Sequence, residues 1–240
     1  MKKISFILTI VFFIQTASAQ KRTYIGAEAA VNHDVFEIID NGTQLANVPF
    51  ITGYYGLNIR QEVGSAVFIE TGLLRKGYGE GIGFKNSQGY GDDNAISAWL
   101  IPLRLGTKIN IKRNKVHLVP VIGYTFGVNR EYGYGDGGSS GFFRSGTDTF
   151  NYAVSSKLSL RRTFPLLQTG IGIECPLFRV ALLSIAANYY TGFKNLIEQD
   201  ITYTHNSRTY TAKGLGKGET LSFGIAVKFP VSGLQRKARK

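Results

Sequence analysis

The sequence predicts an all-β fold, namely an eight-stranded antiparallel up-and-down transmembrane β-barrel with long external loops. Three observations predict it. Eight segments alternate apolar with small or polar residues over about the 9–11 residues that a tilted membrane strand requires. The connections between these segments are alternately long and short. The chain also begins with the features of a secretory signal peptide.

Composition limits the classes of site that the chain can hold. Its 240 residues include 29 glycines, 6 prolines and a single cysteine, Cys175, and the formal charge is +12. One cysteine excludes an intramolecular disulfide framework and any metal site built from several cysteines. The three histidines, His33, His117 and His205, lie far apart without metal-ligand spacing. We therefore expect no catalytic residues, no metal and no cofactor.

The N-terminus predicts export. Two lysines precede an apolar run from Ile4 to Ile14, and small residues follow at Ala17 and Ala19. This is the pattern of a signal peptide cleaved after Ala19. No later stretch reaches the roughly 20 apolar residues of a membrane helix. The expected organisation is a signal peptide over 1–19, an outer-membrane β-barrel over 20–229 and a basic periplasmic tail over 230–240.

Each of the eight segments has one apolar face and one face of small or charged residues. In chain order they are Thr23–Asn32, Phe50–Arg60, Val67–Lys76, Ala98–Asn110, Val116–Val128, Phe164–Cys175, Val180–Gly192 and 219–229. Their apolar faces carry, in the same order, Ile25, Leu57, Ile69, Leu103, Ile122, Ile171, Ile185 and Phe223. Their opposite faces carry Gly26, Gly56, Gly72, Gly106, Gly123, Gly172, Ala186 and Gly224.

The glycine-rich face indicates which side points inward. Glycine weakens a strand unless space is scarce, and the interior of an eight-stranded barrel is just wide enough for side chains to fill it. We therefore expect the aliphatic face to contact lipid. The inward face carries three acids and four bases, which can pair across a plugged lumen: Glu28, Arg60, Glu70, Arg104, Lys108, Glu174 and Lys228. The alternative for Arg60 and Lys228, at strand ends, is exposure to water.

The connections predict sidedness. Short connections over 61–66, 111–115 and 176–179 alternate with long ones up to Pro49 and over 77–94, 129–163 and 193–218. Outer-membrane barrels have short periplasmic turns and longer external loops, and an even strand number places both termini in the periplasm. We expect the Gly- and Ser-rich stretch 129–150 to form a loop with a mobile tip. The segment YAVSSKLSL after it alternates again, so the fifth and sixth strands could extend beyond the membrane as a hairpin. Trp99 and Phe229 are expected at the two membrane interfaces.

Several short segments together resemble a known family. The segments FIETGLL, WLIPLRLG, VIGYTFG and the closing LSFGIAVKF are similar to those of the small outer-membrane β-barrel family, porin-like and PorT-like, of bacteria of the Bacteroidetes type. The resemblance covers essentially the whole mature chain and implies a cell-envelope location in the outer membrane. One departure is that PVSGLQRKARK follows Phe229, where such barrels often end.

The periplasmic side is expected to be strongly basic, whereas the four long loops nearly balance in charge. The predicted periplasmic basic rim comprises Lys112, Arg113, Lys115, Arg179, Arg236, Lys237, Arg239 and Lys240. It could contact anionic outer-membrane lipids or an acidic periplasmic protein partner, or it could be a solvated tail. Nucleic acid is a poor partner for an exported barrel.

These features favour a monomeric, non-enzymatic protein that has a structural or interaction role through its loops or its periplasmic face. An accessory role in secretion or assembly is one option that the resemblance implies. A lipid A-modifying enzyme is an alternative, because His205-Asn206-Ser207 forms an H-x-S triplet of the kind that some lipid A deacylases use. A small-solute pore is a further alternative.

Overall fold

The computed structural model describes residues 22–48, 50–85, 91–112, 116–130, 133–145, 148–177, 181–205 and 208–231. The predicted signal peptide lies outside these residues, as does all but the start of the predicted tail. Among the described residues, no helix has the length and apolar character needed to cross a membrane.

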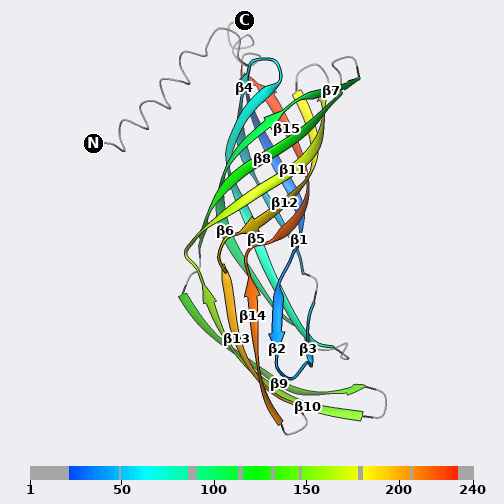
Figure 1. The fold of residues 1–240 in the computed structure, drawn as a ribbon, viewed down its shortest axis with the longest axis vertical. Helices are drawn as coiled ribbons and strands as arrows, with labels where there is room; N and C mark the ends of the chain where they lie inside the picture. Colours follow the sequence, from blue (N-terminus) through cyan, green and yellow to red (C-terminus); the bar gives the residue numbers. More distant parts are fainter. Residues whose placement is uncertain are drawn as a thin grey trace, which may run out of the picture.

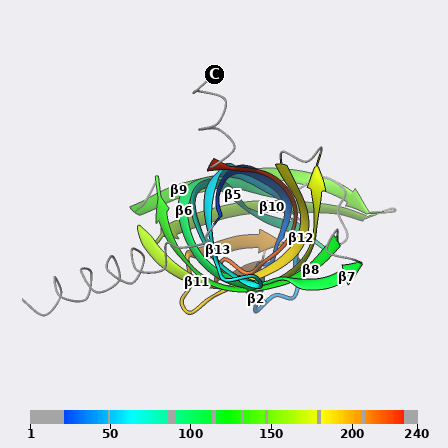
Figure 2. The same cartoon turned by 90° about the horizontal axis from the view of Figure 1, so that it is seen from above.

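Eight strands form a closed antiparallel barrel, which confirms the predicted fold class. In order around the barrel they are β1 (Thr23–Asp34), β4 (Phe50–Val63), β5 (Val67–Phe84), β6 (Gly91–Thr107), β8 (Val116–Asn129), β11 (Thr163–Leu177), β12 (Ala181–Gly192) and β15 (Thr220–Pro230). The barrel closes because β15 pairs with β1, with Phe229 opposite Ile25. Figure 2 shows the resulting ring along its axis.

A second sheet extends from one end of the barrel (Figure 1). Its strands lie in the order β2 (Glu37–Asp40), β14 (Arg208–Gly216), β13 (Ile197–His205), β10 (Asp148–Leu160) and β9 (Gly133–Ser145). Two short strands complete the fold: β3 (Leu45–Asn47) pairs with β5, and β7 (Ile109–Lys112) pairs with β8. The described chain begins and ends together at the opposite end of the barrel, where Tyr24 pairs with Pro230.

The long connections differ from the expected loops, except that the segment YAVSSKLSL forms part of a hairpin, in β10. The stretch 129–163 contains the hairpin of β9 and β10, which pair from Gly133–Leu160 to Ser145–Asp148, and β10 continues the sheet by pairing with β13. The connection after Lys76 is also shorter than expected, because β5 and β6 remain paired as far as Gly83 and Gly91. A backbone ladder needs only N–H and C=O groups, so glycine- and serine-rich segments with few aliphatic residues can still join a sheet.

The interior has two layers along the long axis. The half near the chain ends is filled by charged and amide side chains. The half near the second sheet is filled by an apolar core that continues between the extended β5–β6 hairpin and the second sheet, and that includes Leu74, Tyr78, Phe164, Leu196 and Tyr203. The second sheet is thus anchored to the barrel by shared packing as well as by the connecting strands.

Candidate functional site: a sealed lumen beneath a second sheet

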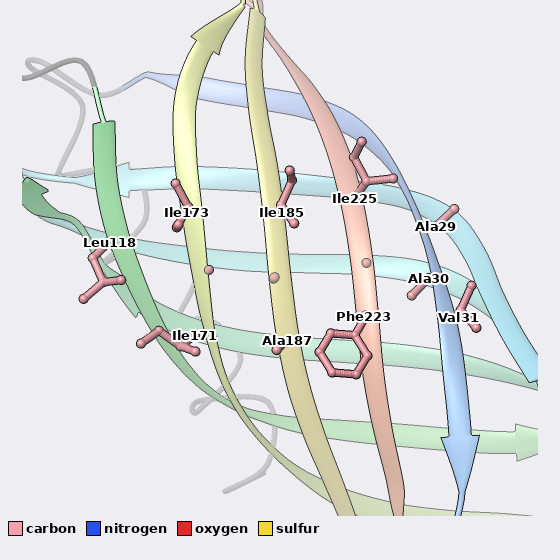
Figure 3. Close-up of a pocket in the computed structure, with 13 residues that line it drawn as sticks. Ala29, Ala30, Val31, Leu118, Ile171, Ile173, Ile185, Ala187, Phe223 and Ile225 are labelled. Carbon is pink, nitrogen blue, oxygen red and sulfur yellow. The ribbon is translucent and has the colours of Figure 1, made fainter. Parts of the chain in front are cut away.

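The outer wall of the barrel is aliphatic. Side chains predicted to face lipid are exposed there, for example Leu57, Leu103 and Phe223, the last of which is 60% exposed. The wall has a hollow of about 630 Å³. Figure 3 shows Ile171, Ile185 and other apolar side chains that line it from neighbouring strands. A continuous aliphatic surface of this kind is stable in hydrocarbon and not in water.

The inward glycines make room for large neighbours. Gly106 lies opposite Phe68 on the adjacent strand, and a Cβ at position 106 would overlap the phenyl ring. Gly127 has the same relation to Phe164. Both rings are buried in the lumen. Glycine on one strand therefore provides the space in which an aromatic ring of the next strand fills the narrow interior.

Glu70 on β5 is the centre of the charged layer. Its carboxylate accepts hydrogen bonds from Arg60 Nε at 2.9 Å, Arg104 Nη1 at 2.9 Å and Lys228 Nζ at 2.6 Å. These three cations come from β4, β6 and β15, so one acid joins strands on both sides of the lumen. The side chains of all four groups are almost fully buried, which strengthens each contact and makes an unpaired charge costly.

Two further acids complete the layer. Glu174 on β11 accepts two hydrogen bonds from Arg60 Nη1, each 2.7 Å long. Glu28 on β1 accepts hydrogen bonds from both terminal nitrogens of Arg104, at 2.8 and 2.9 Å. Three carboxylates thus face three cations, and their formal charges sum to zero. The remaining space among these side chains is only about 50 Å³, room for no more than one or two water molecules.

Six of the seven predicted lumen charges meet in this network. Lys108 does not: it pairs with Glu62 and is only partly buried, near the end of the barrel where the chain begins. Exposure to water was the alternative for Arg60 and Lys228, but each is only 2% exposed. Both strands continue beyond these residues, so each side chain lies within the wall and not at its rim.

A separate buried ion pair, that of Lys76 and Asp34, was not predicted from the sequence. The Lys76 ammonium donates to Asp34 Oδ1 at 2.7 Å, and Thr52 and Thr220 donate to the same carboxylate at 2.7 and 2.6 Å. The alternation of inward and outward residues along the strands could have predicted this pair. Asp34 has the inward phase of Glu28 but was placed beyond the end of its strand, and Lys76 was treated as the last residue of its strand.

The other predicted residues divide between the outer wall and the undescribed ranges. Trp99 and Phe229 lie on the outer wall, 44% and 46% exposed. The basic rim lies outside the described residues, except that the backbone of Lys112 ends β7. His205 ends β13 in the second sheet, away from the barrel wall, and the other two residues of the triplet are not described. Among the residues that are described, no three His, Cys, Asp or Glu side chains gather as metal ligands.

The second sheet has its own buried contact. Tyr203 on β13 is fully buried, packs against Phe84 and donates its hydroxyl hydrogen to the carboxylate of Asp40 on β2, with O···O distances of 2.8 and 3.0 Å. Burial and this carboxylate raise the pKa of the Tyr203 hydroxyl above its usual value. The contact ties β2 to the sheet from the side opposite β9.

A closed barrel with an aliphatic wall and a charge-paired lumen defines a β-barrel protein of the outer-membrane type. No protein-family model matches the sequence, and no curated protein matches it. The fold is similar to that of the outer membrane protein OprG from Pseudomonas aeruginosa, at 13% identity and a TM-score of 0.48, with 87% of this chain and 96% of that chain covered.

Two other solved structures have a similar fold. A major outer membrane protein from Thermus thermophilus has 12% identity, a TM-score of 0.42 and coverage of 86% and 99%. Ail, the attachment invasion locus protein of Yersinia pestis, solved in complex with a heparin analogue, has 12% identity, a TM-score of 0.41 and coverage of 88% and 100%. At these identities the likeness concerns the fold alone.

Proposed function

We propose that this chain is a non-enzymatic outer-membrane protein whose sealed barrel holds the second sheet outside the cell, where the sheet binds a partner. The observation that carries this proposal is the double closure of the barrel, by the charged layer and by the apolar core above it. A barrel closed in this way has no room for a solute path, so its useful surface lies at its ends.

The charged layer argues against the small-solute pore. An ion that crossed it would have to separate buried charge pairs held at 2.6 to 2.9 Å, and the network offers no net charge to attract it. Beyond this layer the path meets tightly packed Leu74, Leu100 and Leu166, each at most 1% exposed. We expect no single-channel conductance from the refolded chain in planar bilayers.

The free edge of β9 is the surface that we expect to bind the partner. In the described part of the chain β9 pairs with β10 alone, so its other edge presents backbone N–H and C=O groups. Such an edge can accept a further strand from another chain. A partner in the cell envelope that donates a strand to β9 would give this protein the accessory role in secretion or assembly that the resemblance implies.

The proposed orientation places β9 outside the cell and both termini in the periplasm. Its support is the asymmetry of the barrel: tight turns such as that around Gly64 lie at the end where the described chain begins and ends, and the second sheet extends from the other end. The basic rim and an acidic periplasmic partner remain a separate hypothesis, which crosslinking from the C-terminal tail would test.

Proline substitution at two successive residues of β9 tests the partner surface. Successive N–H groups of a strand point to opposite edges, so Ser139→Pro and Ser140→Pro each remove one donor, one facing β10 and the other the open edge. We expect photocrosslinking from β9 in intact cells to capture a protein with the parent chain. The variant that lacks the N–H on the open edge should still fold but should lose this crosslinked product. The proposal fails if this variant keeps its crosslinks, or if no protein is crosslinked from β9 in the parent.

A further inference from the structure

A band of five exposed cations lies where the barrel strands pass into the second sheet. We call it the basic collar; it comprises Arg130, Arg161, Arg162, Lys194 and Lys217. The described ion pairs involve none of Arg130, Arg161, Lys194 and Lys217. The sequence did not reveal the band, because these cations are up to 87 residues apart and the long connections nearly balance in total charge.

Backbone hydrogen bonds link the segments of the collar side by side. The Asn129 N–H donates to Arg162 O at 2.8 Å, and the Arg161 N–H donates to Leu196 O at 3.0 Å. The Leu196 N–H donates in turn to Gly216 O at 2.7 Å. The four segments therefore form a continuous arc over β8, β11, β12 and β15, and the arc is held by main-chain contacts, not by flexible side chains.

The arc directly follows the outer end of the lipid-facing surface. On β8 the outward row continues from Phe126 through Val128 to Arg130, each two residues further along the strand. On β12 the outward row includes exposed Tyr189, and exposed Phe193 directly follows the strand, immediately before Lys194 of the collar. Aromatic side chains favour the boundary between hydrocarbon and headgroups, so cations just beyond them lie at headgroup level.

One part of the collar is hollowed. A recess of about 210 Å³ is lined by Ser159, Arg161, Asn195, Leu196 and Glu198. Arg161 Nε donates to the Asn195 carbonyl oxygen at 3.0 Å, which fixes the guanidinium beside the recess. The Glu198 carboxylate accepts from Asn195 Nδ2 at 3.1 Å. Arg161 and Ser159 can supply donors for an anionic oxygen, while the Glu198 carboxylate places a negative charge on the same recess.

We infer that the basic collar binds the phosphate groups of anionic lipids in the outer leaflet, with one phosphate in the recess beside Arg161. Three features together support phosphate headgroups: clustered cations, a level directly above an aromatic boundary, and a recess lined by an arginine and a serine. Arginine is suited to phosphate because its planar fork of donors matches two phosphate oxygens. No residue of the collar belongs to β9, so the inference stands or fails independently of the proposed partner, but its placement in the outer leaflet rests on the proposed orientation.

Lipid retention by the purified full-length barrel tests this inference. The protein is refolded into vesicles containing either bis-phosphorylated lipid A or the same lipid without phosphates, then extracted in mild detergent, and the bound lipid is measured by mass spectrometry. Each basic residue near an anionic surface strengthens binding about fivefold. We expect the phosphorylated lipid to be preferred, and Arg161→Gln/Lys217→Gln to lower its affinity about 25-fold.

The matched control removes two exposed cations from the second sheet, Arg208→Gln/Lys213→Gln, and should leave lipid retention unchanged. Gel mobility with and without heating verifies that each variant is folded. Equal loss in both double variants, equal retention of the phosphate-free lipid, or full displacement by millimolar inorganic phosphate or an acidic peptide would each overturn the inference.

Discussion

Glu70→Gln should destabilise the barrel by about 3–5 kcal/mol, the usual cost of removing one partner from a buried ion pair. The substitution does not affect the three cations around Glu70 equally, because they differ in their other carboxylate partners. Arg60 keeps Glu174, and Arg104 keeps Glu28. Lys228 has no other carboxylate partner in the described ion pairs and is only 2% exposed, so its ammonium is left buried and uncompensated. The formal charge of the layer rises from zero to +1.

The assay is urea unfolding of the barrel in lipid vesicles. Trp99 is the single tryptophan and lies on the outer wall, so its fluorescence reports the loss of the hydrocarbon environment. Asp200→Asn is the matched control, because it breaks the exposed pair with Lys213, whose separation is 3.7 Å, and should cost less than about 1 kcal/mol.

A double variant separates the orphaned charge from other effects. Glu70→Gln/Lys228→Met removes the uncompensated ammonium and should recover more than half of the loss, which is the signature of coupling between two groups. The reasoning is refuted if Glu70→Gln lies within about 1 kcal/mol of the parent, or if the double variant is no more stable than the single one.

Two further perturbations address the packing and the second sheet. Gly127→Leu should abolish folding because its side chain would overlap the Phe164 ring, and Phe164→Ala in the same chain should restore it, as scored by heat-dependent gel mobility; equal yields with and without the second change would contradict this. Tyr203→Phe should cost about 1 kcal/mol below pH 10 by removing the hydrogen bond to Asp40. Because the folded-state pKa of Tyr203 lies above the unfolded value of about 10, its stabilisation is full at lower pH and is lost as the pH rises towards the folded-state pKa. The free energy of unfolding should therefore fall above pH 10 more steeply in the parent than in Tyr203→Phe, and parallel curves would exclude this role.

The barrel was predictable because one physical constraint acts on every residue of its strands. Lipid on one side and a narrow lumen on the other require strict alternation. The sequence alone therefore predicts that Ile225 faces lipid and Gly224 faces the lumen, whichever strands pair with theirs. The same constraint brought Glu70 and Arg104 to one face of neighbouring strands, where they pair across the ladder. Alternation does not give the length of a strand: Asp34 and Lys76 follow the inward phase, yet Asp34 lies two residues beyond the predicted end of its strand and Lys76 lies at the predicted end of its own.

Apart from the segment YAVSSKLSL in β10, the second sheet was not predicted, for a different reason. The pairing partners of its strands, and not a lipid boundary, determine their structure, and residues such as Gly137 and Gly138 in β9 carry no hydrophobic period. The basic collar also depends on which segments pair. Arg161 and Lys217 become neighbours only through the pairing of β13 and β14 and the bonds that Leu196 makes to both segments. Hydrophobic periodicity predicts which face of a strand is apolar, but it does not predict which strands become neighbours. It therefore cannot predict a surface that depends on strand pairing. The two proposed binding surfaces of this protein, the edge of β9 and the basic collar, are both of that kind.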